Sequence, residues 1–115
     1  EGASGIYFSK LIERLGIADA VKAKAVRQPG GLIGELVAAR KAELAVQQIP
    51  ELMAVPGIEF VGPLPEAIQL TTVSVAGIFA SAREPAAAQA LLDFLTSPAS
   101  ARVFKARGLE PAATA

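Results

Sequence analysis

The chain contains neither cysteine nor histidine. Without cysteine it forms no disulfide, offers no thiolate to a metal ion and has no cysteine nucleophile. Without histidine it lacks the commonest general base and metal ligand. The sequence also shows no phosphate-binding loop and no pair of carboxylates at a spacing typical of catalysis. We therefore expect a protein that is not an enzyme, with no catalytic residues, no metal site and no cofactor.

The chain carries no excess of positive or negative charge, and it has no long hydrophobic run. Eleven basic residues balance eleven acidic ones, which argues against a nucleic-acid partner or an anionic membrane surface. The longest uncharged run, residues 67–82, contains glutamine, threonine and serine and is shorter than the roughly 20 apolar residues that cross a bilayer. No signal peptide is visible and the first residue is Glu1, so we expect the sequence to begin inside a longer chain.

The remaining composition predicts an α/β domain. With 115 residues, 52% of them hydrophobic, the chain is long enough to bury a core. Helical periodicity alternates with short apolar runs, which is typical of a mixed sheet flanked by helices. We expect helices at residues 3–16 and 32–42, and short strands near 24–27, 43–48 and 58–65.

The last third of the chain predicts a long strand followed by two helices. The run IQLTTVSVAGIFAS carries about ten consecutive residues of β-preferring type, longer than the usual 5–6 residues of a strand. Pro85 and Pro98 suit the first turns of the helices, and Ser97 suits the N-cap of the second. Gly108 suits the position that follows the last turn of the second helix. The residue after it, Leu109, can then contact Phe104 as in a Schellman motif.

Two expected helix starts are small and free of acids. The first is Ser4-Gly5, after which no acid occurs until Glu13, and the second is Gly30-Gly31. Helix starts carry free N–H groups with partial positive charge, so an anion can bind there. The alternative interpretation is that serine and glycine simply begin helices well.

A pair of neutral amides, Gln47-Gln48, closes the expected strand at 43–48. Ligand groups in α/β sheets tend to lie at such strand ends, where the amides could donate hydrogen bonds to a bound solute. The alternative is a polar pair whose hydrogen bonds go to the backbone or to water.

Three segments carry a resemblance to a known family. The runs SGIYFSKLIERLGI, ELVAARKAELAVQQ and LLDFLTSPASARVFKARGLEP resemble the molybdate-binding periplasmic proteins of ABC importers, within the type II periplasmic binding protein superfamily. The resemblance covers nearly all of this chain but about the C-terminal half of the family's chain. It implies two α/β lobes around a cleft, in which neutral donors hold a tetrahedral oxyanion such as molybdate, tungstate or sulfate.

The resemblance also implies which residues bind the ligand. Ser4 and Gly30 fall where the family offers backbone N–H groups, and Gln48 falls where close relatives have a tyrosine that contacts the oxyanion. A glutamine amide differs from a tyrosine hydroxyl in reach, so another small polar solute stays open as the ligand. The expected site comprises these residues and their neighbours Gly5, Gly31 and Gln47.

The expected organisation follows from the same resemblance. Residues 1–67 would be an α/β segment of the second lobe, residues 68–82 a hinge and crossover strand, and residues 83–115 C-terminal helices that pack on a first lobe outside this sequence. With that lobe absent, we expect this chain to self-associate through its apolar C-terminal helices.

The predicted function is that of the solute-binding component of an ABC importer. Its partners would be a small oxyanion and a membrane permease, and its location periplasmic, or extracellular with a lipid anchor. The alternatives are an effector-sensing domain of a transcription regulator with the same fold, an enzyme on this fold, and a purely structural α/β module.

Overall fold

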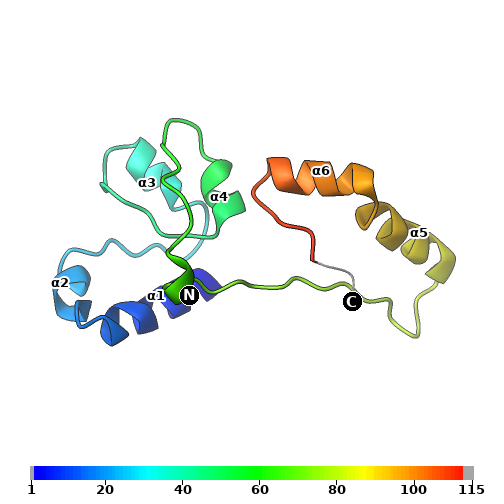
Figure 1. The fold of residues 1–115 in the computed structure, drawn as a ribbon, viewed down its shortest axis with the longest axis horizontal. Helices are drawn as coiled ribbons and strands as arrows, with labels where there is room; N and C mark the ends of the chain where they lie inside the picture. Colours follow the sequence, from blue (N-terminus) through cyan, green and yellow to red (C-terminus); the bar gives the residue numbers. More distant parts are fainter. Residues whose placement is uncertain (1, 113–115) are drawn as a thin grey trace. The chain divides into compact units, whose positions relative to one another are not determined.

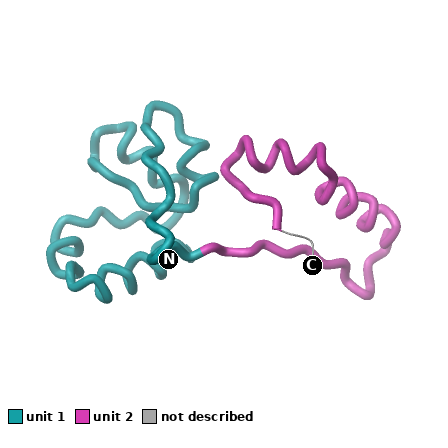
Figure 2. Tube along the Cα trace, viewed as in Figure 1, with its two compact units in different colours: residues 1–70 teal, residues 71–115 magenta. Residues whose placement is uncertain are grey.

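The computed structural model describes residues 2–112 and divides the chain into two compact units. Unit 1 comprises residues 1–70 and unit 2 comprises residues 71–115 (Figure 2). Each unit has its own helices and its own packing, with α1 against α2 in unit 1 and α5 against α6 in unit 2.

Unit 1 consists of short helices joined by long loops (Figure 1). The helices are α1 (Ala3–Arg14), α2 (Ala18–Lys22), α3 (Gly34–Ala38), α4 (Ile49–Met53) and the 3₁₀ helix η1 (Glu66–Ile68). α1 is the longest of these, and its apolar stripe buries Leu11 and Ile12, each 3% exposed. The predicted first helix is therefore confirmed.

The C-terminal end of α1 leads directly into α2. Gly16 adopts a positive φ of 72° and donates from its N–H to the Glu13 carbonyl, while Ile17 donates to the Ile12 carbonyl. This pair of bonds is the Schellman motif, in which glycine accepts the left-handed conformation without a Cβ clash. α2 then packs on α1, and Lys22 forms an ion pair with Glu13 at 2.9 Å.

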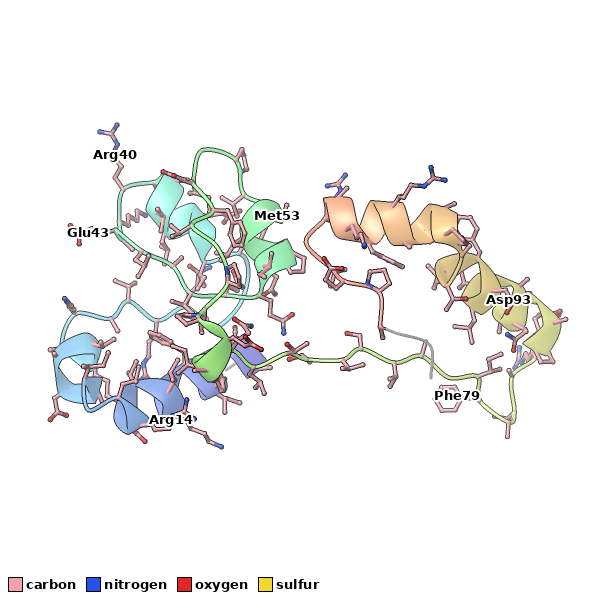
Figure 3. All side chains as sticks on the ribbon, in the orientation of Figure 1. Arg14, Arg40, Glu43, Met53, Phe79 and Asp93 are labelled. Atoms are coloured by element: carbon pink, nitrogen blue, oxygen red, sulfur yellow. The ribbon has the colours of Figure 1, made fainter. Side chains whose placement is uncertain are left out.

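α3 ends in the same motif, but with arginine where α1 has glycine. Arg40 has a φ of 58°, and its N–H donates to the Val37 carbonyl at 2.9 Å. Lys41 donates to the Leu36 carbonyl at 2.8 Å, which completes the pair of bonds. Figure 3 shows the Arg40 side chain projecting away from α3. A residue with a Cβ is held here in a conformation that favours glycine.

Close packing around Gly34 joins α3 to the segment after α4. Gly34 is buried, and Val55 beside it is 7% exposed. A Cβ placed on Gly34 would lie 2.9 Å from Ile58 Cδ1 and 3.2 Å from Val55 Cγ2. The absence of a side chain at this position therefore lets the two segments approach each other.

Unit 2 contains α5 (Pro85–Leu95) and α6 (Pro98–Ala106), which pack on each other. Each helix begins with its proline, and the Ser97 side chain accepts a hydrogen bond from the Ser100 N–H. At the end of α6, Gly108 has a φ of 82° and donates to the Lys105 carbonyl, and the following N–H donates to the Phe104 carbonyl. The prediction for these two helices, including the Ser97 cap and the Schellman motif, is confirmed.

The expected α/β fold with a short mixed sheet is wrong. Within residues 2–112 the structure contains no β-strand, and the runs expected as strands at 24–27, 43–48, 58–65 and 68–81 are loops or extended chain, apart from η1. A strand is defined by backbone hydrogen bonds to a neighbouring strand, and these runs do not pair with one another. Extended, β-branched sequence alone therefore did not produce a sheet.

Candidate functional site

The first group of candidate donors lies at the start of α1. The Gly2 carbonyl accepts a hydrogen bond from the Ile6 N–H at 3.2 Å, which makes it the first helical acceptor. The N–H groups of Ala3, Ser4 and Gly5 precede that bond, as the leading N–H groups of every α-helix do. No acidic residue lies in this first turn and no side chain caps it, so the predicted acid-free helix start is confirmed.

The second group lies in the loop before α3, and two glutamines hold that loop. The Gln47 side chain accepts from the Ile33 N–H at 3.1 Å and donates to the Gly31 carbonyl at 3.0 Å. Gln28 donates from its side chain to the Gly30 carbonyl at 2.8 Å. Gly31 adopts a φ of 85° between these contacts. Residues 28–33 thus form a turn held by side-chain amides.

Gly30 and Gly31 do not begin a helix, which corrects the expectation. α3 begins at Gly34 and its first turn contains Glu35, so this helix start is also not free of acids. The N–H of Ile33, at the N-cap, bonds to a side-chain amide. The two glycines belong to a loop because the polar turn formed with Gln28 competes with helical hydrogen bonding there.

The side chains of the two neighbouring glutamines, Gln47 and Gln48, have different surroundings. Gln47 is half-buried and uses both ends of its amide on the backbone of the loop, as the alternative interpretation anticipated. Gln48 is exposed and is the N-cap of α4, where its carbonyl accepts from the N–H groups of Glu51 and Leu52. Its side-chain amide makes no hydrogen bond to the described residues. Gln47 therefore positions the loop, whereas the amide of Gln48 is available to a ligand.

The structure joins some of the expected site residues and not others. Hydrogen bonds connect Gly31 with Gln47, and Gly30 takes part in the same turn through Gln28. Among residues 2–112, no hydrogen bond links Ser4 or Gly5 to this turn. All six expected residues belong to unit 1.

Sequence reasoning missed two residues that shape this unit. Gln28 precedes Pro29 in a polar turn, and nothing in its spacing distinguished it from a solvated side chain. The Tyr7 hydroxyl donates to the Ile68 carbonyl, a contact that the sequence analysis did not anticipate. A half-buried tyrosine usually finds such a partner, and this was the signal available.

The charges near the candidate site are few. Arg27, just before the turn, already takes part in an interaction with other residues. On the opposite end of α1, the hydrogen bond from Lys22 and its positive charge lower the pKa of Glu13 below the ordinary glutamate range. No group of three or more carboxylates that could hold a metal ion occurs within the described residues.

Comparison with known proteins assigns the chain to a family. The profile of the bacterial extracellular solute-binding proteins matches residues 1–110. The chain belongs to this family. A relative from Pseudomonas sp., named aconitate isomerase, is 37% identical over 112 residues, which cover 96% of this chain. The same alignment covers 43% of the relative, so the chain spans less than half of that protein's length. No solved structure gives a significant match.

Membership of the solute-binding family confirms the coarser part of the expected resemblance. A bacterial extracellular solute-binding protein acts outside the cytoplasm, in agreement with the predicted location. In residues 2–112 no helix combines the length and the apolar character that a membrane crossing requires.

The expectation that the chain is not an enzyme requires correction. It rested on the absence of histidine and cysteine, yet a relative aligned over almost the whole chain carries the name of an isomerase. General acid–base chemistry can also be performed by carboxylates, lysines and tyrosines, all of which this chain contains. Composition alone was therefore too weak a ground for excluding catalysis.

Proposed function

We propose that this chain forms one lobe of a solute-binding protein that holds a small oxyanion through backbone N–H groups. The observation that carries the proposal is the start of α1, where the N–H groups of Ala3, Ser4 and Gly5 lie ahead of the first intrahelical bond with no acid in the turn. Such a helix start favours negative charge because of its free donors and its dipole.

The turn at residues 28–33 supports the proposal with a second, preorganised backbone element. Because Gln28 and Gln47 fix the carbonyls of Gly30 and Gly31, the conformation of the glycine pair is set before any ligand arrives. The exposed amide of Gln48 adds a neutral side-chain donor in the same unit. A site made of neutral donors suits a tetrahedral oxyanion such as molybdate, tungstate or sulfate.

The organisation that we propose keeps the segments inferred from the sequence. Residues 1–67 provide a segment of the second, ligand-binding lobe, residues 68–82 the hinge and crossover, and residues 83–115 the C-terminal helices that pack on the first lobe, which lies outside this sequence. The 43% coverage of the Pseudomonas relative supports this division, since it leaves room for another lobe in the family's chain. A periplasmic location and an ABC permease partner complete the proposal.

The relative's name favours a second candidate, the isomerisation of aconitate. Aconitate is a tricarboxylate, and carboxylate oxygens accept hydrogen bonds from the same backbone donors that suit an oxyanion. The 37% identity over 96% of the chain is the observation that supports this candidate.

One titration separates these candidates. Amide ¹H–¹⁵N spectra of the chain are recorded with increasing molybdate, sulfate, cis-aconitate or trans-aconitate, and the aconitate spectrum itself is followed for interconversion. The oxyanion proposal expects molybdate or sulfate to shift the amides of residues 3–5 and 30–33. Shifts with aconitate alone favour the second candidate, and interconversion establishes it. Shifts at residues outside unit 1, or none with any anion, contradict both.

A matched pair of variants tests the role of charge. Gly30→Asp adds a carboxylate where a new Cβ meets no atom within 4 Å, and Gly30→Asn adds the same shape without charge. We expect Gly30→Asp to weaken anion binding about tenfold or more, because like charges repel at this range. Gly30→Asn is expected to bind within about threefold of the parent chain. Equal affinities for the two variants would show that the anion binds elsewhere.

A further inference from the structure

The segment that connects the two units changes character at Leu70. Residues 71–78 make no hydrogen bond to any residue that the structure describes, and residues 69–77 are all exposed. The boundary between the two compact units falls at the same point, after Leu70. Segments with exposed backbone and few contacts are those that open and move most easily. The free part of the proposed hinge therefore begins at Thr71.

The part before Thr71 is a short closed loop, residues 64–70, which we call the hinge base. Gln69 closes this loop with both ends of its amide. The side-chain oxygen accepts from the Leu64 N–H at 2.9 Å, and the side-chain nitrogen donates to the Leu70 carbonyl at 3.1 Å. The turn η1 lies inside the loop, and the prolines at positions 63 and 65 limit the backbone φ angles beside it.

Tyr7 attaches the hinge base to α1. Its hydroxyl donates to the carbonyl of Ile68, the last residue of η1, and both residues are half-buried. Figure 1 shows η1, in green, beside the N-terminal end of α1. Within the described residues no other hydrogen bond joins α1 to residues 64–70. One specific polar contact therefore holds the hinge base on this helix.

The proposed anion donors lie one turn away on the same helix. Tyr7 follows Ala3 by four residues and Ser4 by three, so these residues share one face of α1. Helical side chains lean toward the N-terminus of their helix, which brings the Tyr7 ring toward the first turn. The separation along the helix axis is about 3–6 Å. Tyr7 thus links the N–H groups of residues 3–5 directly to the hinge base.

We propose that Tyr7 and Gln69 set the pivot of the hinge at Thr71, so that the α1 donors and the hinge base move as one body. This inference rests on the proposed function, which assigns residues 68–82 to the hinge. Hinge motion is absorbed by a few residues at the end of a rigid element. Thr71 is the first residue after the base that is free to change its backbone angles. Tyr7 is a positioning residue, because it keeps the donor N–H groups aligned with the base while the hinge bends.

The competing position for the pivot lies inside the hinge base. A bend there breaks the bond between Tyr7 and Ile68 or the bonds that Gln69 makes across the loop. A bend at Thr71 breaks no hydrogen bond among the described residues. Each lost hydrogen bond adds to the free energy of bending. The structure therefore favours the pivot after the base.

Backbone dynamics of the full chain, recorded with no anion present, test the position of the pivot. We expect {¹H}–¹⁵N NOE values of ordered backbone as far as Leu70 and a drop in these values from Thr71 onward. A drop that begins within residues 64–70 overturns the proposal. So does the absence of any drop between residues 71 and 78.

Two variants test what fixes the base. Tyr7→Phe removes the bond to Ile68, and Gln69→Met removes both bonds of the amide, each with little change in side-chain size. We expect either change to move the NOE drop back into residues 64–70 and to accelerate amide exchange of Ile68 about fivefold, as the loss of one hydrogen bond predicts. Thr72→Val is the matched control, since it removes a hydroxyl that bonds to none of the described residues, and both readouts are expected to stay unchanged. A drop that stays at residue 71 in either variant overturns the proposal.

A titration with molybdate separates this inference from the proposed function. It follows the amides of residues 3–5 and the carbonyl ¹³C resonance of Ile68. We expect both to respond in the parent chain, and Tyr7→Phe to keep the amide response but lose the response of Ile68. Amides that respond without Ile68 in the parent chain contradict the link through Tyr7. Amides of residues 3–5 that respond to no anion contradict the proposed function, whereas the NOE profile decides the pivot without any anion.

Discussion

The Tyr7 hydroxyl donates a hydrogen bond to the Ile68 carbonyl, 61 residues further along the chain. This contact ties α1, which provides the proposed anion-binding N–H groups, to η1 near the end of unit 1. The half-buried position of Tyr7 makes the bond part of the packing of that unit. The hydrogen bond therefore fixes the N-terminal half of α1 against the C-terminal end of unit 1.

Removal of this hydroxyl is expected to loosen unit 1. Tyr7→Phe keeps the ring but leaves the Ile68 carbonyl without its donor, so we expect a loss of about 1 kcal/mol in the free energy of unfolding. Amide exchange is expected to accelerate in α1 and to stay unchanged in α5, which belongs to the other unit. Equal exchange rates in α1 before and after the substitution would contradict the structural role of this bond.

The neighbouring glutamines at 47 and 48 allow a matched comparison. Gln47→Leu removes both hydrogen bonds that hold the turn at residues 31–33, so we expect a loss of about 1–2 kcal/mol in urea-induced unfolding. Gln48→Leu removes an exposed amide without such bonds and is expected to change stability by less than about 0.5 kcal/mol. If the two variants unfold at the same urea concentration, Gln47 does not hold the turn.

The same substitution is expected to have opposite effects in two helices. Gly34→Ala places a Cβ 3.2 Å from Cγ2 of the stiff Val55 side chain, and we expect it to destabilise the chain by about 1 kcal/mol despite the better helix propensity. Gly5→Ala meets no atom within 4 Å and is expected to stabilise α1 by about 0.5–1 kcal/mol. Thermal unfolding of both variants measures the difference in sign.

Arg40 is a site for stabilisation. It occupies the left-handed position of the Schellman motif after α3, where glycine avoids a Cβ clash of about 1–2 kcal/mol. We expect Arg40→Gly to raise the free energy of unfolding by about 1 kcal/mol. Arg40→Ala is the control, because alanine also carries a Cβ and gains nothing from the change. A gain in the alanine variant would assign the effect to the lost charge instead.

The ion pair between Glu13 and Lys22 predicts a pH dependence of the contact between α1 and α2. Lys22 lowers the pKa of Glu13 in the folded chain, so the pair stabilises above the unfolded-state pKa, about 4.3, and is lost as the pH falls through the lower folded-state value. We expect an NMR titration of the Glu13 carboxyl to show a midpoint below the ordinary glutamate range. Lys22→Met is expected to return the midpoint to that range, and an unchanged midpoint would contradict the pairing.

The helices were largely predictable from sequence because their signals are local. Ser97, Pro98 and Gly108 each set the backbone within a few residues, and α6 with its cap and final turn follows from them. α1 likewise follows from its apolar stripe, and Gly16 forms the Schellman motif after its last turn. The start of α3 was not predicted correctly. The loop that precedes it is held partly by Gln47, which lies 14 to 16 residues further along the chain than the backbone groups that it binds.

The sheet could not be predicted because strands depend on partners that lie elsewhere. Val73 and Val75 have the residue type of a buried strand, yet both are exposed and neither belongs to a ladder. The candidate site shows the same limit. Gln47 and Gln48 are adjacent residues of the same type, so the sequence does not distinguish them. The loop before α3 lies beside Gln47, which therefore binds its backbone, whereas Gln48 does not.

The uncharged run at residues 69–82 has a consequence for handling the protein. It contains no charge and no proline, is rich in β-branched residues, and forms no strand pair within the described chain. Segments with these properties nucleate cross-β fibrils, in which identical strands stack and satisfy each other's backbone groups. Prolonged storage at high concentration is therefore expected to convert this chain into thioflavin-positive aggregate, starting from this run.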